Sequence, residues 1–228
     1  MANAHRQHLY LKAVDFFDGS NPQGGFFQLR EIILMNEEMN DEERELWIDI
    51  VRAIVSLYVD TQELPTTLEL REELKVFLID CIYLLEMHLL PLSTEITADV
   101  KYYEELGNSY FYMSALTEGV EASIYSNFSL SSYVYGYELA LEVFGPSYPL
   151  TLISADNIAL LYSDVFDDKE VALEVAETAV DAVHLEQHFT DNKEEEEFVN
   201  KMLNKLETHI LKWTKELKQG NLGNTNLN

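Results

Sequence analysis

Two histidines lie four residues apart in the stretch HLEQH, at His184 and His188. This spacing is about one turn of a helix, so both imidazoles could face one zinc ion. No third ligand is evident, and a metalloprotease of the HExxH kind needs Glu directly after the first His, where this chain has Leu185. We therefore expect no metal site. A helical metalloprotein or hydrolase remains an alternative that rests on this pair alone.

Other motifs of enzyme active sites are missing from the sequence. It contains no P-loop, GxGxxG, GxSxG or CxxC motif. Among its 41 acidic residues no pair stands out for acid–base catalysis, and the acidic run at 194–197 suits the first turn of a helix. We expect a protein that is not an enzyme and that needs no cofactor.

Basic residues recur near the C-terminus at steps of four, four and three, which would place them in one stripe along a helix: Lys201, Lys205, His209 and Lys212. The formal net charge of the chain is −26, so a basic stripe is conspicuous. It could bind an anionic or acidic segment of another protein. It could equally be a solvated helix side that balances the acidic run nearby.

The elements that position these residues are expected to be helices. Between turn-forming stretches such as FFDGSNPQGGFF and FGPSYPL, apolar residues recur at steps of three and four. We predict an all-α bundle of about nine antiparallel helices. Their expected positions are near residues 4–18, 25–36, 41–62, 66–89, 95–117, 121–144, 149–164, 168–187 and 194–218. The stretch FDDKE predicts a helix N-cap at Asp167.

Length and composition bound the domain organisation and the partners. With 228 residues, 47% of them hydrophobic, we expect a single helical domain over 1–219 and a disordered tail over 220–228. The strong negative charge repels nucleic acid and anionic membranes, so partner proteins are the expected ligands. A lone Cys81 and the lack of a long apolar run fit a cytoplasmic protein.

Several stretches together resemble the 14-3-3 family. They are NDEERELW (40–47), LLEMHLLP (84–91), KYYEELGNSYFYMSAL (101–116), GPSYPLTLISADNIALLYSDVFDDKEVALEVAETAVDAV (145–183) and LETHILKWT (206–214). The resemblance implies nine antiparallel helices that form a concave amphipathic groove. It also implies an adaptor that binds phosphoserine or phosphothreonine segments of client proteins, usually as a dimer.

The resemblance places a phosphate site on the third and fifth helices, where the family has a Lys, two Arg and a Tyr. Arg52 stands at the Lys position, and Val59 and Phe111 replace the two arginines. Tyr112 is kept, and a further groove Lys aligns with Glu104. Each charge-assisted hydrogen bond contributes about 1.5–3 kcal/mol, so losing two arginines implies phosphopeptide binding weaker by roughly two to four decades.

The resemblance also carries over residues that hold the bound peptide. Asn157 is kept on the seventh helix, beside Asp156, where the family has an apolar residue. On the last helix Trp213 is kept, and His209 aligns with a second peptide-holding Asn.

Two apolar positions of the groove wall align with Lys205 and Lys212. We hypothesise that the basic wall has moved to the last helix, so that these two lysines and Arg52 face acidic or phosphorylated segments. The predicted partner-binding residues are Arg52, Tyr112, Asn157, Lys205, His209, Lys212 and Trp213.

The sequence departs from the family at the positions where the family forms its dimer. The family pairs its first helix with the third and fourth helices of a second copy. Here the first helix ends early in DGSNPQGG, and Asp15 occupies an apolar interface position. The hairpin between Val59 and Leu84 is also about twenty residues shorter, which removes roughly 15 Å from each helix. We expect a monomer or a non-standard dimer.

Two functions remain open after this comparison. The first is an adaptor or scaffold whose groove binds partner proteins, with weakened phosphate recognition. The second is a structural member that binds no phosphopeptide and acts through association with other proteins. Retention of Arg52, Tyr112, Asn157 and Trp213 together favours the adaptor.

Overall fold

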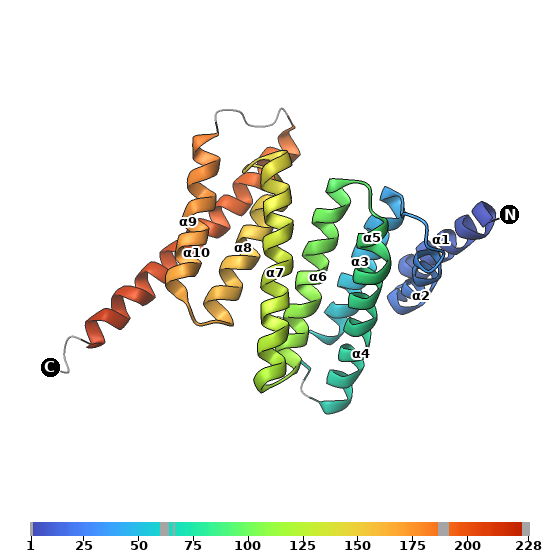
Figure 1. The fold of residues 1–228 in the computed structure, drawn as a ribbon, viewed down its shortest axis with the longest axis horizontal. Coiled ribbons are helices and arrows are strands. Elements are labelled where there is room, and N and C mark those ends of the chain that lie inside the picture. Colours follow the sequence, from blue (N-terminus) through green and yellow to red (C-terminus); the bar gives the residue numbers. More distant parts are fainter. Residues whose placement is uncertain (1, 60–63, 66, 187–191, 225–228) are drawn as a thin grey trace. The chain divides into compact units, whose positions relative to one another are not determined.

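The computed structural model describes residues 2–59, 64, 65, 67–186 and 192–224. For residues 2 and 220–224 it describes the backbone alone. These described residues form helices joined by short turns and contain no strand (Figure 1). The all-α prediction is therefore confirmed. Within the described ranges, no helix is both long and apolar enough to cross a membrane.

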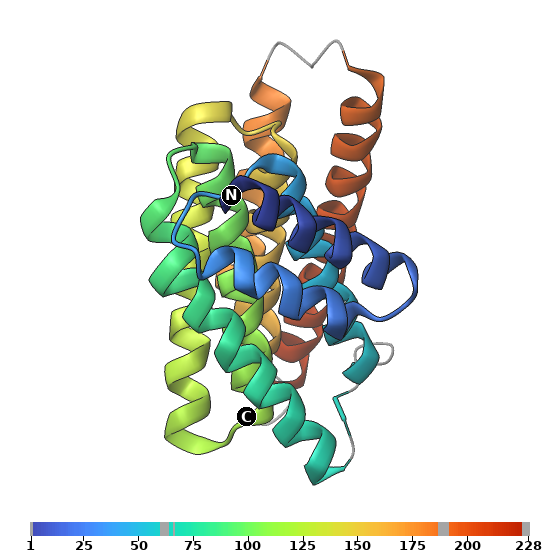
Figure 2. The same cartoon turned by 90° about the vertical axis from the view of Figure 1, so that its right-hand side faces the viewer.

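Residues 1–129 form one of two compact units. Its helices are α1 (Ala2–Asp18), α2 (Pro22–Ile33), α3 (Asp41–Tyr58), α4 (Leu68–Leu84), α6 (Ile96–Leu116) and the first part of α7 (Gly119–Phe144). A π-helical turn, η1 (Leu85–Leu89), leads from α4 without a break into α5 (Leu90–Leu92). Figure 2 shows α1 and α2 as an antiparallel hairpin.

Side-chain caps set the starts of three helices in this unit. The Asn21 side chain accepts a hydrogen bond from Gly24 N, and Pro22 occupies the first turn of α2. Asn40 and Glu43 form a reciprocal capping box at the start of α3. The Thr67 hydroxyl caps α4 in the same way as Asn21 caps α2.

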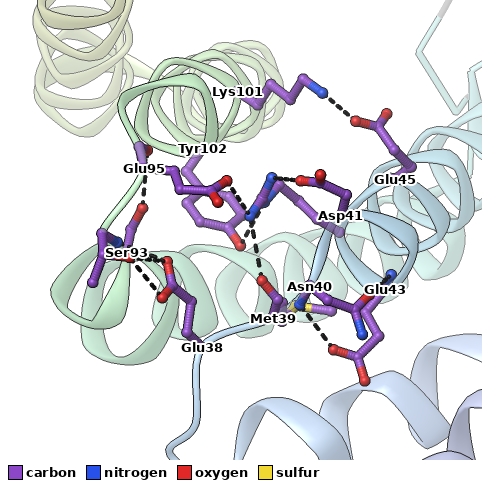
Figure 3. Close-up of polar contacts among 12 residues, drawn as sticks. Glu38, Met39, Asn40, Asp41, Glu43, Glu45, Ser93, Glu95, Lys101 and Tyr102 are labelled. Carbon is purple, nitrogen blue, oxygen red and sulfur yellow. Dashed lines mark hydrogen bonds and ion pairs between the residues drawn. The ribbon is translucent and has the colours of Figure 1, made fainter.

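Buried Arg44 on α3 pairs with Glu95, the N-cap residue of α6. Its partners Met39, Asp41, Glu95 and Tyr102 are labelled in Figure 3. Its guanidinium donates to Asp41 Oδ1 at 2.6 Å and to the Met39 carbonyl at 3.3 Å, and it lies over the Tyr102 ring. Lys101 reaches across from α6 to Glu45 on α3. These contacts fix α3 relative to α6, which matters because Arg52 lies about two turns further along α3.

Residues 130–228 form the second unit. It holds the remainder of α7, α8 (Pro149–Asp164), α9 (Lys169–Leu185) and α10 (Lys193–Asn224). Alanines on α9 let neighbouring helices approach closely, and the core of the unit includes Ala172, Ala176, Ala179, Val183, Leu206 and Trp213. Helix α9 packs against both α8 and α10.

Two helix boundaries in this unit, the start of α9 and the end of α10, differ from those expected from the sequence. The N-cap of α9 is Asp168, whose carboxylate accepts from Val171 N at 3.1 Å, and not Asp167. Asp167 has a φ of 53°, a left-handed conformation in the turn that rules out the extended geometry of an N-cap. Helix α10 continues to Asn224, although its expected end was 218. A single domain over 1–219 remains a prediction.

Candidate functional site

In the first unit, Arg52 on α3 is bound to two glutamates of α6. Its Nε and Nη2 donate to Glu105 Oε1 at 2.8 and 2.5 Å, and Nη2 lies 3.3 Å from Glu104 Oε1. Both glutamates are buried, whereas 53% of the Arg52 side chain is exposed. Arg52, a predicted binding residue, is therefore paired with the carboxylates of two buried residues.

Glu104 and Glu105 share one cation, Arg52, and its single positive charge does not balance two carboxylates. Burial, followed by repulsion from Glu105, raises the pKa of Glu104 to about 7, although Arg52 and Lys101 act in the opposite direction. Burial also raises the pKa of Glu105, against the effect of Arg52 and a hydrogen bond from Asn108. Glu104 Oε2 has no hydrogen-bond partner among the described residues. Ionisation of both glutamates gives this cluster an excess of negative charge.

A pocket of ≈ 270 Å³ opens beside this cluster. Its polar lining comes from Arg52, Ser56, Glu105, Asn108, Ser109 and Tyr112. Arg52 is its one basic lining residue in the described part of the chain. The structure therefore brings together two of the predicted binding residues, Arg52 on α3 and Tyr112 on α6.

Val59 and Phe111, which the sequence analysis expects at the positions of two family arginines, add no charge to this pocket. Val59 follows the last residue of α3 with extended backbone and packs against an apolar cluster that includes Leu74 and Met113. It was expected inside the helix, but α3 ends at Tyr58. The Phe111 ring is half-buried and lies edge-on against Tyr112, with 5.5 Å between ring centroids.

In the second unit, buried Asp156 on α8 binds two residues of α10. Lys205 Nζ lies 2.6 Å from Asp156 Oδ2, and His209 Nδ1 lies 3.0 Å from Oδ1. The His209 ring lies over Trp213 at 5.2 Å between centroids, and Trp213 is itself 1% exposed. Lys205 and His209 therefore compensate a buried acid, and Trp213 supports the imidazole from the core.

The remaining predicted residues of this unit are differently placed. Asn157, next to Asp156 on α8, is half-buried, and its amide makes no hydrogen bond with another described side chain. Lys212 is exposed on α10, where its positive charge helps to lower the pKa of the Glu216 carboxyl, which is hydrogen-bonded to Lys169. These two predicted residues therefore lie outside the Asp156 cluster.

Sequence reasoning missed the partners of the basic residues. Glu105 was not singled out, and Asp156 was noted only as a departure from an apolar position. A usable signal was present in both cases, since an acid inside an otherwise apolar helix face needs a cation. His184 lies exposed at the end of α9, and His188 lies outside the described residues. Within those residues no cluster of three His, Cys, Asp or Glu could hold a metal ion.

Comparison with known proteins identifies the family. A profile described as 14-3-3 protein matches residues 62–214, which is more than half of the chain. The match begins after α3, so the assignment of Arg52 and Val59 to family positions rests on the resemblance of the preceding stretch, NDEERELW.

Individual relatives give the same result at modest identity. The 14-3-3 protein 7 of Solanum lycopersicum is 27% identical over 151 residues, 65% of this chain and 59% of that protein. The 14-3-3 protein epsilon of Drosophila melanogaster is 24% identical over 151 residues, 65% of this chain and 56% of that protein. The checkpoint signal transducer rad25 of Schizosaccharomyces pombe is 28% identical over 113 residues, 50% of this chain and 42% of that protein.

The chain thus spans less than two thirds of the length of each of these relatives. The profile match and the all-helical fold nevertheless agree over the segments that carry α4 to α10. This chain belongs to the 14-3-3 family.

Proposed function

We propose that the chain is an adaptor or scaffold that binds segments of partner proteins in the amphipathic groove of its family, with weakened recognition of phosphoserine and phosphothreonine. The observation that carries this proposal is the pairing of Arg52 with Glu104 and Glu105. A phosphate dianion at Arg52 must compete with two buried carboxylates that are already in place. Val59 and Phe111 supply no positive charge that could compensate.

The other predicted residues divide into free and engaged groups. The Asn157 amide is free to hold a peptide backbone, and Lys212 is free to pair with an acidic side chain. Lys205 and His209 are engaged by Asp156, so they attract an anion more weakly than two unpaired bases do. We propose that partner proteins, phosphorylated or not, bind through such contacts in the cytoplasm, and that nucleic acid and membranes are not ligands.

Fluorescence anisotropy with a degenerate phosphoserine peptide pool and its unphosphorylated twin, at two salt concentrations, tests the proposal. We expect both pools to bind with affinities that differ by less than about tenfold. Tight binding of the phosphorylated pool alone contradicts weakened phosphate recognition. Binding of neither pool favours the second function, a structural member that acts through association with other proteins.

A gain-of-function variant tests the reason for the weak recognition. Val59→Arg combined with Phe111→Arg restores two guanidinium groups, and Glu104→Gln releases Arg52 from one carboxylate. We expect the triple variant to raise the preference for the phosphorylated pool by about tenfold or more, because each charge-assisted hydrogen bond adds about 1.5–3 kcal/mol at best. Val120→Arg with Glu118→Gln and Glu121→Gln makes the same change of charge at exposed positions elsewhere on the first unit and should leave the preference unchanged.

Charge reversal tests the role of the basic stripe on α10. Lys205→Glu with Lys212→Glu should abolish salt-sensitive binding of acidic segments, and unchanged binding contradicts the proposed role. Lys193→Glu with Lys218→Glu is the matched control, because it makes the same change of charge on another side of α10.

The oligomeric state is part of the proposal. We propose a monomer or a non-standard dimer. Size-exclusion chromatography with light scattering measures this directly, and a tight dimer of the family kind contradicts it.

A further inference from the structure

The first unit carries a second hollow, separate from the pocket at Arg52. It has a volume of ≈ 580 Å³ and lies between α2, α3 and α4. Phe26, Ile54 and Phe77 contribute apolar lining, with the rings of Phe26 and Phe77 edge-on at 4.9 Å between centroids. Because Phe26 and Ile54 belong to the buried core, the shape of the hollow is held by the packing of the unit.

Large apolar side chains at this hollow remain open to solvent. Phe27 is 61% exposed and Val76 is 68% exposed, and both line the hollow. Ile79 and Tyr83 continue an exposed apolar strip along α4. Single exposed apolar residues are ordinary, but a hollow flanked by a continuous apolar strip is typical of an interaction site.

Carboxylates surround this apolar surface: Glu69, Glu72, Glu73 and Asp80 line the hollow. Lys75 pairs with Glu72, Arg30 pairs with Asp80, and the Tyr58 hydroxyl donates to Glu73. Glu69 is exposed and forms no ion pair with a described residue. The acids at the rim therefore outnumber the bases that pair with them, and the rim has an excess of negative charge.

We propose that this hollow docks an amphipathic helix of a different protein, with apolar side chains in the hollow and Lys or Arg side chains against the acidic rim. From Glu69 at the rim to Tyr83 at the end of the apolar strip, the surface extends about 21 Å along α4, at about 1.5 Å per residue, which matches a helix of about 14 residues. Charge complementarity selects a basic partner segment. The proposal is independent of the function proposed for the groove.

Charge also makes a second copy of this chain a poor occupant of the hollow. The family resemblance assigns the third and fourth helices to contact with the first helix of a second copy. In this chain Asp15 lies exposed on α1 and would bring a further carboxylate to an acidic rim. The formal net charge of −26 on each copy adds long-range repulsion.

A labelled helical peptide of about 16 residues, with Leu on one face and Lys on the other, is the probe, and fluorescence anisotropy is the readout. We expect saturable one-to-one binding by the full chain. Phe27→Ser with Val76→Ser should weaken this binding by about tenfold or more, because both side chains lose apolar contact. Glu69→Lys should weaken it by about threefold and reduce its dependence on salt. Val120→Ser is the matched control, since Val120 is 79% exposed on α7.

Three outcomes overturn the proposal. A scrambled peptide of the same composition that binds equally well shows attraction by charge alone. An equal loss of binding in Val120→Ser shows that the hollow is not the site. A dimer that light scattering detects, and that Phe27→Ser with Val76→Ser dissociates, shows that a second copy occupies the hollow. Circular dichroism of each variant checks that the helices are retained, which is expected because Phe27 and Val76 are exposed.

Discussion

Each of the two units contains a basic residue that the sequence analysis predicts to bind partners, and in each unit this residue is paired with a buried carboxylate. The balance of charge differs between them. In the first unit one guanidinium, that of Arg52, serves Glu104 and Glu105. In the second unit one carboxylate, that of Asp156, accepts from the ammonium of Lys205 and the imidazole of His209. The first cluster has an excess of acid, and the second an excess of bases.

This difference has consequences for ligands. A site with an excess of acid repels a phosphate, and removal of one carboxylate should strengthen phosphate binding there. A site with an excess of bases tolerates an anion, and removal of its carboxylate should strengthen anion binding further. The following substitutions separate the two clusters by these opposite responses.

The largest effect is expected from Glu104→Gln. The pKa of Glu104 is raised from 4.5 to about 7 by burial and by Glu105, so the wild-type chain loses stability as the pH rises from about 4.5 through 7. The loss is about 3 kcal/mol, because one pKa unit corresponds to about 1.4 kcal/mol. Glu104→Gln should therefore stabilise the chain at pH 8 and change little at pH 4.5. Urea denaturation across this pH range measures it.

A residual dependence on pH should remain in this variant, because the pKa of Glu105 is also raised. The exposed Glu118 provides the control Glu118→Gln, which should leave the pH dependence as it is. A Glu104→Gln profile that superimposes on the wild-type profile contradicts the excess of acid in this cluster.

The next effect is expected from Arg52→Met, which leaves both glutamates without their cation. Breaking a buried pair in this way costs about 3–5 kcal/mol, and the half-exposed Arg52 side chain should reduce this to about 2 kcal/mol. The loss should be larger at pH 8 than at pH 5, because protonation relieves the glutamates. Equal losses at both pH values, measured by urea denaturation, argue against an electrostatic cause.

The helices could be predicted from the sequence because their signals are local. Apolar periodicity indicated the helices α1 to α4 and α6 to α10, and its errors lie at helix ends, such as the end of α3 at Tyr58 and the end of α10 at Asn224. The capping motif FDDKE misplaced the cap of α9 by one residue, since the cap is Asp168. The π-helical turn at Leu85–Leu89 leaves the apolar periodicity nearly unchanged, so it was not foreseen.

The clusters could be predicted only in part, because their contacts join distant positions. Arg52 and Glu105 are separated by 53 residues, as are Asp156 and His209. Comparison with a family can indicate which helix carries such a residue. It cannot indicate a pairing between residues that differ from those of the family. Two kinds of signal indicated that the surroundings had changed: Glu104 and Asp156 stand at positions of another chemical type in the family, and Glu105 is an acid inside an otherwise apolar helix face.

A smaller effect is expected in the second unit from Lys205→Met. Asp156 keeps its hydrogen bond with His209, so it is not left alone in the core. We expect a loss of about 1 kcal/mol, the usual value for one hydrogen bond. Lys201→Met, on the same stripe and exposed, should change stability by less than about 0.5 kcal/mol. A loss from Lys205→Met that equals that from Arg52→Met would remove the difference between the two clusters.

The smallest effect is expected from Asp156→Asn, and its sign distinguishes the units most clearly. The substitution removes the one carboxylate that engages Lys205 and His209, so the positive charge of α10 becomes available to an anion. Binding of an acidic, unphosphorylated peptide pool should strengthen by about threefold at low salt, and the gain should disappear at high salt. Asp164→Asn, an exposed acid on the same helix, controls for the change of net charge. If Asp164→Asn gives the same gain, the effect comes from the overall charge of the chain, and the stripe on α10 has no special role in binding.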